Sequence, residues 1–270
     1  TGQQIGALTT AITAGGLTTS QIVALSSTQV SGLTSNQIAA LSTANVAALE
    51  TTDLAALKTS SVAALSSSQL AALGTSQIVG LTSAQVGALS SKQVVSMGTT
   101  ALAAIETSDL VPLRTNVISA LSTSQFAGLT TSQIAALTSQ QIGALTTAIV
   151  AGMTTSQVVA LSTAQASGLT SNQVVAMGTS QLAAIETSDL AALKSSAIRG
   201  LSTSQFAGLT TSQIAALTSQ QIGALTTAVI ASGFTTSQIV ALSSSQISGL
   251  SSAQIAALAT ASVAAMETTD

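Results

Sequence analysis

Leucine, or a residue of similar size, recurs at every eighth position along most of the chain. The series begins at Leu8, restarts at Leu17 after one extra residue, and runs in step to Leu225. A second extra residue precedes Phe234, after which the series continues to Met266. The chain therefore contains about 33 copies of an octad with the consensus Leu, Ser/Thr, Ser/Thr, any residue, Gln, Ile/Val, a small residue, Ala/Gly. A fixed short period of this kind is typical of repeat architectures.

Longer blocks of octads are also duplicated. Residues 122–148 recur nearly unchanged at 202–228, and residues 3–11 recur at 140–148. No shift in composition or linker interrupts the series, so we predict one continuous octad-repeat array over residues 1–270. Because the first and last octads look like interior ones, we expect the array to be a segment of a longer chain or of a filament.

Each octad carries the signals of a short helix. In the octad that starts at Leu17, Thr18 and Gln21 have the spacing of a capping box, with the hydroxyl at the N-cap and Gln at N3. Leu17 and Ile22 then occupy the two positions of a hydrophobic staple. We predict helix from Thr19 to Leu25, with Ile22 and Leu25 on its buried face. Helices this short are unstable alone, which predicts an all-α solenoid of very short helices, one per octad.

A β-solenoid is the alternative. Thr, Ile and Val favour strands, and short periods occur in β-helices. Against it, Ala is abundant, the octad lacks in–out alternation, and capping signals have no role in a strand. One long helix fits less well, since eight residues overshoot two helical turns by about 80° and the apolar stripe would wind around the rod.

The composition excludes several classes of protein. Only 5% of the 270 residues are charged, the net charge is −3 and 46% of the residues are hydrophobic. A disordered chain has the opposite composition, with low hydrophobicity and high net charge. Five basic residues cannot form a track for nucleic acid, and no apolar run is long enough to span a membrane. His and Cys are absent and nothing activates any Ser, although Lys92 lies within a Ser-rich octad. We therefore expect no enzyme activity, no catalytic residue and no cofactor.

Four octads carry charge clusters of the form Glu-Thr-Ser/Thr-Asp. Such carboxylate pairs are weak candidates for Ca²⁺, although no glycine-rich calcium loop accompanies them. A structural interpretation is simpler, with Glu at the capping position, Asp at N3 and the helix dipole favouring both. Lys58, Arg114 and Lys194 follow three of these clusters and would complement helix carbonyls. The candidate residues are Glu50, Asp53, Glu106, Asp109, Glu186, Asp189, Glu267 and Asp270.

The Ser, Thr and Gln positions form columns along the array. We expect these columns to face solvent or other copies of the chain, where they would cap helices or pair chains side by side. O-glycan attachment and ordering of water by a Thr array are further hypotheses.

Two resemblances bear on function. Residues 17–26, with the sequence Leu-Thr-Thr-Ser-Gln-Ile-Val-Ala-Leu-Ser, resemble the first helix of the repeats in TAL-effector DNA-binding proteins. The base-reading loop and the basic residues of those repeats are missing, so the resemblance does not imply DNA binding. The whole chain resembles octad-repeat tracts of large bacterial extracellular proteins, such as adhesin stalks, surface-layer proteins and fibres. That resemblance implies an extracellular or cell-surface structural role with the chain itself as partner. The alternative is an adhesin or binding module that presents its surface to a glycan or protein.

Overall fold

The computed structural model describes residues 1–259, 263–264 and 266. The chain forms two compact units, Thr1–Leu137 and Thr138–Asp270. Every element of the described residues is helical, and none is a strand. The all-α prediction is thus confirmed, and the β-solenoid alternative is wrong for this part of the chain. Whether residues 1–270 form one continuous array remains a prediction.

The α-helices are four to six residues long, one per octad. The first unit contains α1 (Gly2–Gly6), η1 (Ile12–Gly16), α2 (Thr19–Val23), α3 (Ser27–Val30), α4 (Ser35–Ala40), α5 (Thr43–Ala47), α6 (Thr51–Ala56), α7 (Thr59–Ala63), α8 (Ser67–Ala71), α9 (Thr75–Val79), α10 (Ser83–Gly87), α11 (Ser91–Val95), α12 (Thr99–Ala103), α13 (Thr107–Leu110), α14 (Thr115–Ile118), α15 (Thr123–Ala127) and α16 (Thr131–Ala136). The second contains α17 (Ser139–Gly143), α18 (Thr147–Ala151), α19 (Thr155–Val159), α20 (Thr163–Gly168), α21 (Ser171–Val175), α22 (Thr179–Ala184), α23 (Thr187–Ala192), α24 (Ser195–Arg199), α25 (Thr203–Ala207), α26 (Thr211–Ala216), α27 (Ser219–Gly223), α28 (Thr227–Ser232), α29 (Thr236–Val240), α30 (Ser244–Ile247) and α31 (Ser252–Ala257).

The predicted capping box forms. In α2, the Thr18 side chain accepts a hydrogen bond from the Gln21 N–H, while Gln21 Oε1 accepts one from the Thr18 N–H at 2.9 Å. The helix ends at Val23, two residues earlier than predicted, because the Leu25 N–H bonds the Ile22 carbonyl at 3.1 Å and so tightens the last turn. The corners need only helical and extended backbone, since no described residue has a positive φ.

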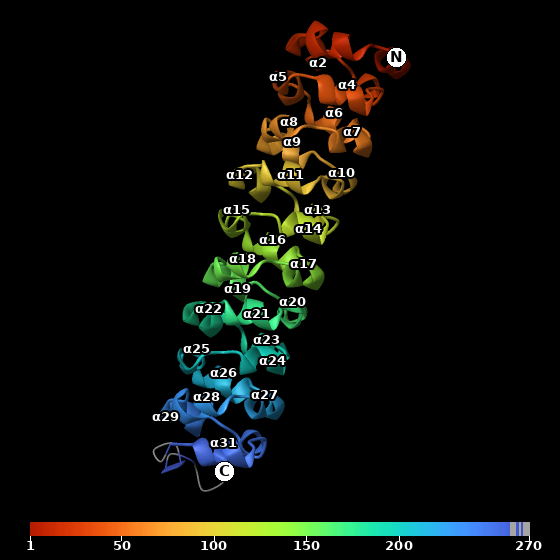
Figure 1. The fold of residues 1–270 in the computed structure, drawn as a ribbon. Coiled ribbons are helices and arrows are strands. Elements are labelled where there is room, and N and C mark those ends of the chain that lie inside the picture. Colours follow the sequence, from red (N-terminus) through yellow and green to blue (C-terminus); the bar gives the residue numbers. More distant parts are fainter. Residues whose placement is uncertain (260–262, 265, 267–270) are drawn as a thin grey trace. The chain divides into compact units, whose positions relative to one another are not determined.

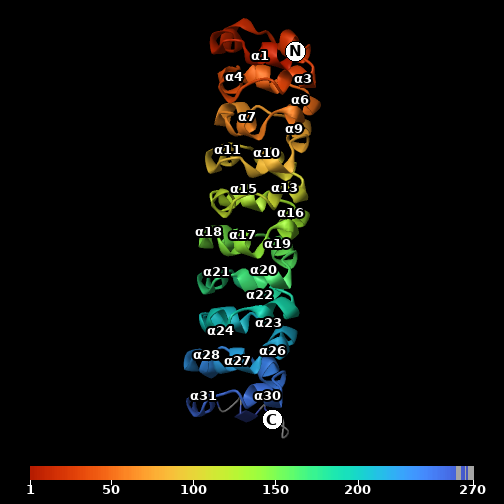
Figure 2. The same cartoon turned by 90° about the vertical axis from the view of Figure 1, so that its right-hand side faces the viewer.

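Within each unit, a helix packs against the third helix after it. In the first unit α4, α7, α10 and α13 form one such column, and Figure 1 shows α7, α10 and α13 one below another. The helices α3, α6 and α9 form a second column, visible at the right-hand edge of Figure 2. In the second unit α17, α20 and α23 form an equivalent column. Within each unit the chain therefore winds as a coil, and each turn of this coil contains at least three octads.

The core consists of the first and sixth residues of each octad. Ile38, Leu41, Val46 and Leu49 are at most 4% exposed, and the same positions are buried in most other octads. Full burial of one such aliphatic side chain contributes roughly 1.5–3 kcal/mol. An octad gains this only against its neighbours, which is why helices of five residues persist here although they would melt alone.

Two octads absorb the extra residues seen in the sequence. The one between Leu8 and Leu17 lies in the π-helical turn η1, and a π-bulge accommodates one inserted residue. The one before Phe234 extends α28, where the Gly233 N–H bonds the Val229 carbonyl at 2.7 Å. The octads on either side therefore keep their stacking.

Candidate functional site

In many helices a glutamine at N3 links neighbouring turns of the coil. In α8, Gln69 Oε1 accepts the Ser66 N–H at 2.7 Å, which closes the capping box. Its Nε2 group donates to the carbonyls of Ile38 at 3.0 Å and Leu41 at 2.7 Å, at the end of α4. One side chain thereby accepts the N–H that begins its own helix and donates to two carbonyl groups at the end of a helix four octads earlier, where the Ile38 carbonyl also accepts the Leu41 N–H at 3.2 Å.

The same bridge recurs through both units. The prediction that the Gln column faces solvent is wrong for these residues, because the carbonyl ends of the previous turn need buried donors. Besides Gln69, the glutamines that donate in this way include Gln37, Gln77, Gln85, Gln93, Gln125 and Gln133 in the first unit, and Gln173, Gln181, Gln205, Gln213, Gln221, Gln238, Gln246 and Gln254 in the second.

Three of the four acidic octads lie in the described residues, and each buries its aspartate at N3. Asp53 and Asp189 are each 3% exposed. Asp53 accepts a hydrogen bond from Ser27 Oγ at 2.7 Å, and Asp189 accepts one from Thr163 Oγ1 at 2.7 Å. Asp109 has the equivalent partner in Ser83. In each case the hydroxyl comes from the first residue of the helix three octads earlier, so these aspartates also connect adjacent turns.

The glutamates of these octads take a different position. Glu50, Glu106 and Glu186 occupy the N-cap position as predicted, but they are exposed and none makes a side-chain cap hydrogen bond. No group of three or more acidic residues that could hold a metal occurs among the described residues. The structure thus brings no set of the predicted Ca²⁺ candidates together, while Glu267 and Asp270 lie outside the described residues.

The basic residues that follow the acidic octads stand at N-cap positions. Lys58, Arg114 and Lys194 precede α7, α14 and α24. Arg114 Nη2 donates to the Leu89 carbonyl at 3.1 Å, so this base complements a carbonyl 25 residues earlier rather than one on the preceding helix. The N3 residue of that octad is Val117, whose side chain cannot donate, and Arg114 supplies the hydrogen bond that a glutamine gives elsewhere.

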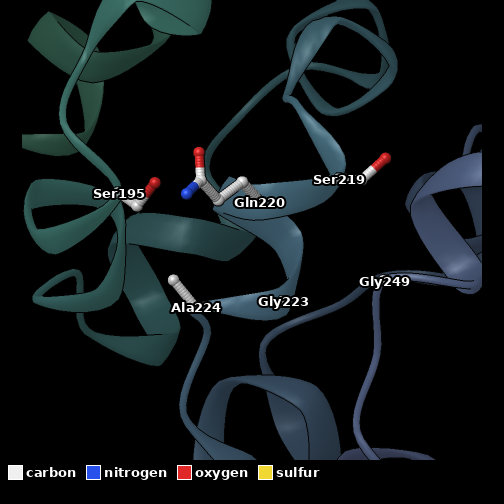
Figure 3. A pocket seen from close by; sticks show the side chains of 6 residues that line it. All are labelled: Ser195, Ser219, Gln220, Gly223, Ala224 and Gly249. Atoms are coloured by element: carbon white, nitrogen blue, oxygen red, sulfur yellow. The ribbon is translucent and has the colours of Figure 1, made fainter.

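The surface of the second unit has a hollow of about 520 Å³ between α24, α27 and the chain after α30. It is lined by Ser195, Ser219, Gln220, Gly223, Ala224 and Gly249. Figure 3 shows the Gln220 side chain reaching out from α27, with Ser219 pointing away from it. The lining contains no acid, base or metal ligand, so it offers hydrogen-bonding groups but no group that could activate a nucleophile. No helix in the described part of the chain is long and apolar enough to cross a membrane.

Comparison of the sequence with models of known protein families identifies the repeat. The model of the ALTTAQ repeat matches residues 15–43, 46–83, 70–99, 102–139, 182–219 and 232–260, which together make up more than half of the chain. The chain belongs to the ALTTAQ repeat family. Each matched stretch spans several of the octads described above, and matches in both units confirm the repeat tract.

Other comparisons add little to the ALTTAQ assignment. No curated protein matches the chain. Among solved structures, the leucine-rich repeat-containing protein LegL7 from Legionella pneumophila is similar over 79% of this chain and 69% of its own, with 16% sequence identity and a TM-score of 0.23. A TM-score this low leaves the correspondence between the two folds undefined.

Proposed function

We propose that this ALTTAQ repeat chain is a structural element that associates with copies of itself. In this proposal it contributes to a bacterial extracellular fibre, filament or surface layer and has no enzyme activity. Most of the Leu and Ile side chains are buried in the core of each unit, and most of the Gln side chains are buried as well. Only the exposed octad positions can therefore contact another copy of the chain.

The outward-facing seventh position of the octad carries the proposal. It holds a small apolar residue in most octads, and where it holds Val the side chain is 38–49% exposed in seven octads. These residues are Val23, Val79, Val95, Val111, Val159, Val175 and Val240. With five basic and eight acidic residues in 270, neighbouring copies repel each other weakly. Repeated apolar contacts of this kind can add up along two chains that lie side by side.

Association can be tested with a charge placed on these positions. The purified chain is expected to sediment as larger species with rising concentration and to form regular filaments or sheets in negative-stain electron microscopy. A variant with Val79→Lys, Val95→Lys, Val159→Lys and Val175→Lys should stay monomeric, because like charges would then face each other. The matched control replaces the same four residues with Thr, which keeps their shape and neutrality.

Circular dichroism must show unchanged helix content in both variants for the comparison to count. Monomers of the unmodified chain at high concentration, without filaments, would refute self-association. If such monomers bound a glycan or a protein instead, the binding-module hypothesis would replace it. Protease treatment of intact cells of the natural host tests the location separately, since a surface protein is digested and an internal one is protected.

A further inference from the structure

Nearly identical octads pose a problem of register. The Leu and Ile columns repeat in almost every octad, and capping boxes and Gln bridges in many of them, so most of these contacts would re-form if part of the coil shifted by one octad. The buried aspartates do not prevent this. Asp109 pairs with the hydroxyl of Ser83, but Thr75 and Ser91 place a hydroxyl at the same position in the octads before and after. Some other feature must distinguish the native stacking.

Glycines at the seventh octad position provide that distinction. Outside the two octads with an extra residue, this position is Gly four times, and each of these glycines faces Gly or Pro at the eighth position of the third octad after it. The pairs are Gly6 with Gly32, Gly87 with Pro112, Gly143 with Gly168 and Gly223 with Gly249. The two residues of each pair lie within the same unit.

The pairs are steric contacts. A Cβ atom on Gly143 would lie 2.8 Å from the Gly168 carbonyl oxygen, and one on Gly168 would lie 2.8 Å from the Ser139 carbonyl oxygen. A Cβ on Gly223 would lie 2.6 Å from the Gly249 carbonyl oxygen. At these distances the backbones of the two helices would have to separate, and overpacking of this kind destabilises a fold.

The pairing follows position in the coil rather than spacing in the sequence. Gly143 and Gly168 are 25 residues apart, whereas Gly223 and Gly249 are 26 apart because an extra residue lies between them. Gly6 and Gly32 are also 26 apart, across the extra residue in η1. In all three cases the partner is the eighth residue of the third octad on, so the match belongs to the stacked structure.

The pair in the middle of the first unit discriminates most strongly. A Cβ on Gly87 would lie 3.0 Å from Pro112 Cβ, where α10 packs against α13. The octads on either side of Gly87 carry Val79 and Val95 at the same position. If α13 stacked one octad too early or too late, the Pro112 ring would meet a Val side chain where it now meets a glycine. Pro112 is the only proline of the chain.

We propose that these Gly–Gly and Gly–Pro pairs set the stacking register of the coil, with Gly87 and Pro112 as the main determinant in the first unit. The shared Leu, Ile and Gln contacts hold any stack together, and the pairs select the stack in which all of them form at once. This inference concerns folding within one chain and does not depend on self-association.

The test moves the pair by one octad. In the double variant Val79→Gly/Gly87→Val, the accommodating glycine lies one octad too early for Pro112. A second double variant, Ala104→Pro/Pro112→Ala, moves the proline by the same step. Combining all four changes makes the glycine and the proline face each other again, one octad earlier, and places valine opposite alanine where the pair stood before. The native chain already has that combination where Val79 lies opposite Ala104 and Val95 opposite Ala120.

Engineered disulfides report the register directly, since the chain has no cysteine of its own. Asn116 Nδ2 lies 3.4 Å from Ser91 Oγ, so Ser91→Cys/Asn116→Cys should cross-link only in native register. The pair Ser83→Cys/Asn116→Cys should cross-link only when the stack is shifted by one octad in the direction that Val79→Gly/Gly87→Val favours, and Thr99→Cys/Asn116→Cys only when it is shifted in the opposite direction, which Ala104→Pro/Pro112→Ala favours. These pairs are introduced into each background, and cross-linking is compared with the urea midpoint of the same protein without cysteines.

Each double variant should lower the urea midpoint and reduce the ratio of native to shifted cross-link about tenfold or more, as expected for an overpacked contact. The quadruple variant should recover most of both quantities. If a double variant does not fold, recovery in the quadruple variant still supports the proposal. Double variants that match the unmodified chain, or a quadruple variant no better than the doubles, would overturn it.

Discussion

The Gln bridge can be tested by one substitution that keeps the capping box and removes the donor. Gln69→Glu keeps a hydrogen-bond acceptor at N3, where a capping box can have either Glu or Gln. The carboxylate of the new side chain cannot donate to the carbonyls of Ile38 and Leu41. Gln69 is 2% exposed, so the new charge would be buried against two acceptors at the positions that now lie 3.0 and 2.7 Å from Nε2.

Two terms set the size of the effect. Loss of two hydrogen bonds costs about 1–3 kcal/mol, at 0.5–1.5 kcal/mol each. A buried charge without a partner costs about 3–5 kcal/mol, part of which repacking and water relieve. We expect Gln69→Glu to destabilise the first unit by about 3–5 kcal/mol. Gln69→Leu adds no charge but also removes the acceptor of the Ser66 N–H, so at about 0.5–1.5 kcal/mol for each of its lost hydrogen bonds we expect about 1.5–4.5 kcal/mol.

Gln21 provides a matched control within the same unit. Its Oε1 atom accepts the Thr18 N–H at 2.9 Å, as in the other capping boxes, but its Nε2 group makes no hydrogen bond to the described residues and the side chain is exposed. Gln21→Glu should therefore be neutral or slightly stabilising, because the negative charge interacts favourably with the helix N-terminus.

The assay is hydrogen exchange under native conditions, supported by urea denaturation followed by circular dichroism. Arrays of repeats open locally, so exchange of the amides in α4 and α8 reports the bridge itself. Three kcal/mol corresponds to roughly a hundredfold faster exchange through opening. If Gln69→Glu and Gln21→Glu changed exchange and midpoint equally, the inter-turn donor would have no energetic role and the reasoning would be refuted.

Three further outcomes are expected. Asp53→Asn should stay within about 1 kcal/mol of the unmodified chain, because the amide oxygen can still accept from Ser27, and millimolar Ca²⁺ should leave the thermal midpoint of either protein unchanged. Gly98→Ser should stabilise the first unit by a few tenths of a kcal/mol, measured by urea denaturation, because Gly98 is an N-cap without a side chain and a Cβ there meets nothing within 4 Å. Phe206→Leu should destabilise the second unit by about 1–2 kcal/mol in the same assay, through lost volume and the lost edge contact with Phe234, whose ring centroid lies 4.7 Å away.

The helical part of this fold could be predicted from the sequence because its signals are local. Thr18, Gln21, Leu17 and Ile22 lie within six residues, and the capping box and staple depend only on that spacing. The predicted end of the helix was wrong by two residues. Ala24 is a good helix former, and nothing in the octad sequence shows that the Leu25 N–H bonds the Ile22 carbonyl and so ends the helix at Val23.

The stacking could not be predicted in the same way. An octad repeat is consistent with any number of octads per turn, since every octad offers the same Leu and Ile to its neighbours. The carbonyl partners of Gln69 lie 28–31 residues earlier, and the hydroxyl partner of Asp53 lies 26 residues earlier. Neither separation can be inferred from the sequence of a single octad. The glycine pairs are visible in the sequence, as a Gly at the seventh position of one octad and a Gly or Pro at the eighth position of the third octad after it. They can be recognised as pairs only once the third octad is known to be the neighbour.

One sequence signal of the bridge was nevertheless available. A capping box accepts Glu or Gln at N3, and Glu also suits the helix dipole. In this chain the fifth octad position, which becomes N3, contains Gln in most octads and never Glu, while all four glutamates stand at the second octad position instead. Capping alone does not explain that exclusion. A need for an N–H donor does, in the octads whose N3 side chain must reach the carbonyl groups of the previous turn. Where the N3 side chain instead accepts a hydroxyl of the previous turn, the residue is Asp, as at Asp53, Asp109 and Asp189. The low charge of the chain follows in part from this requirement, since a neutral amide is the side chain that can accept at one end and donate at the other in a dry interface.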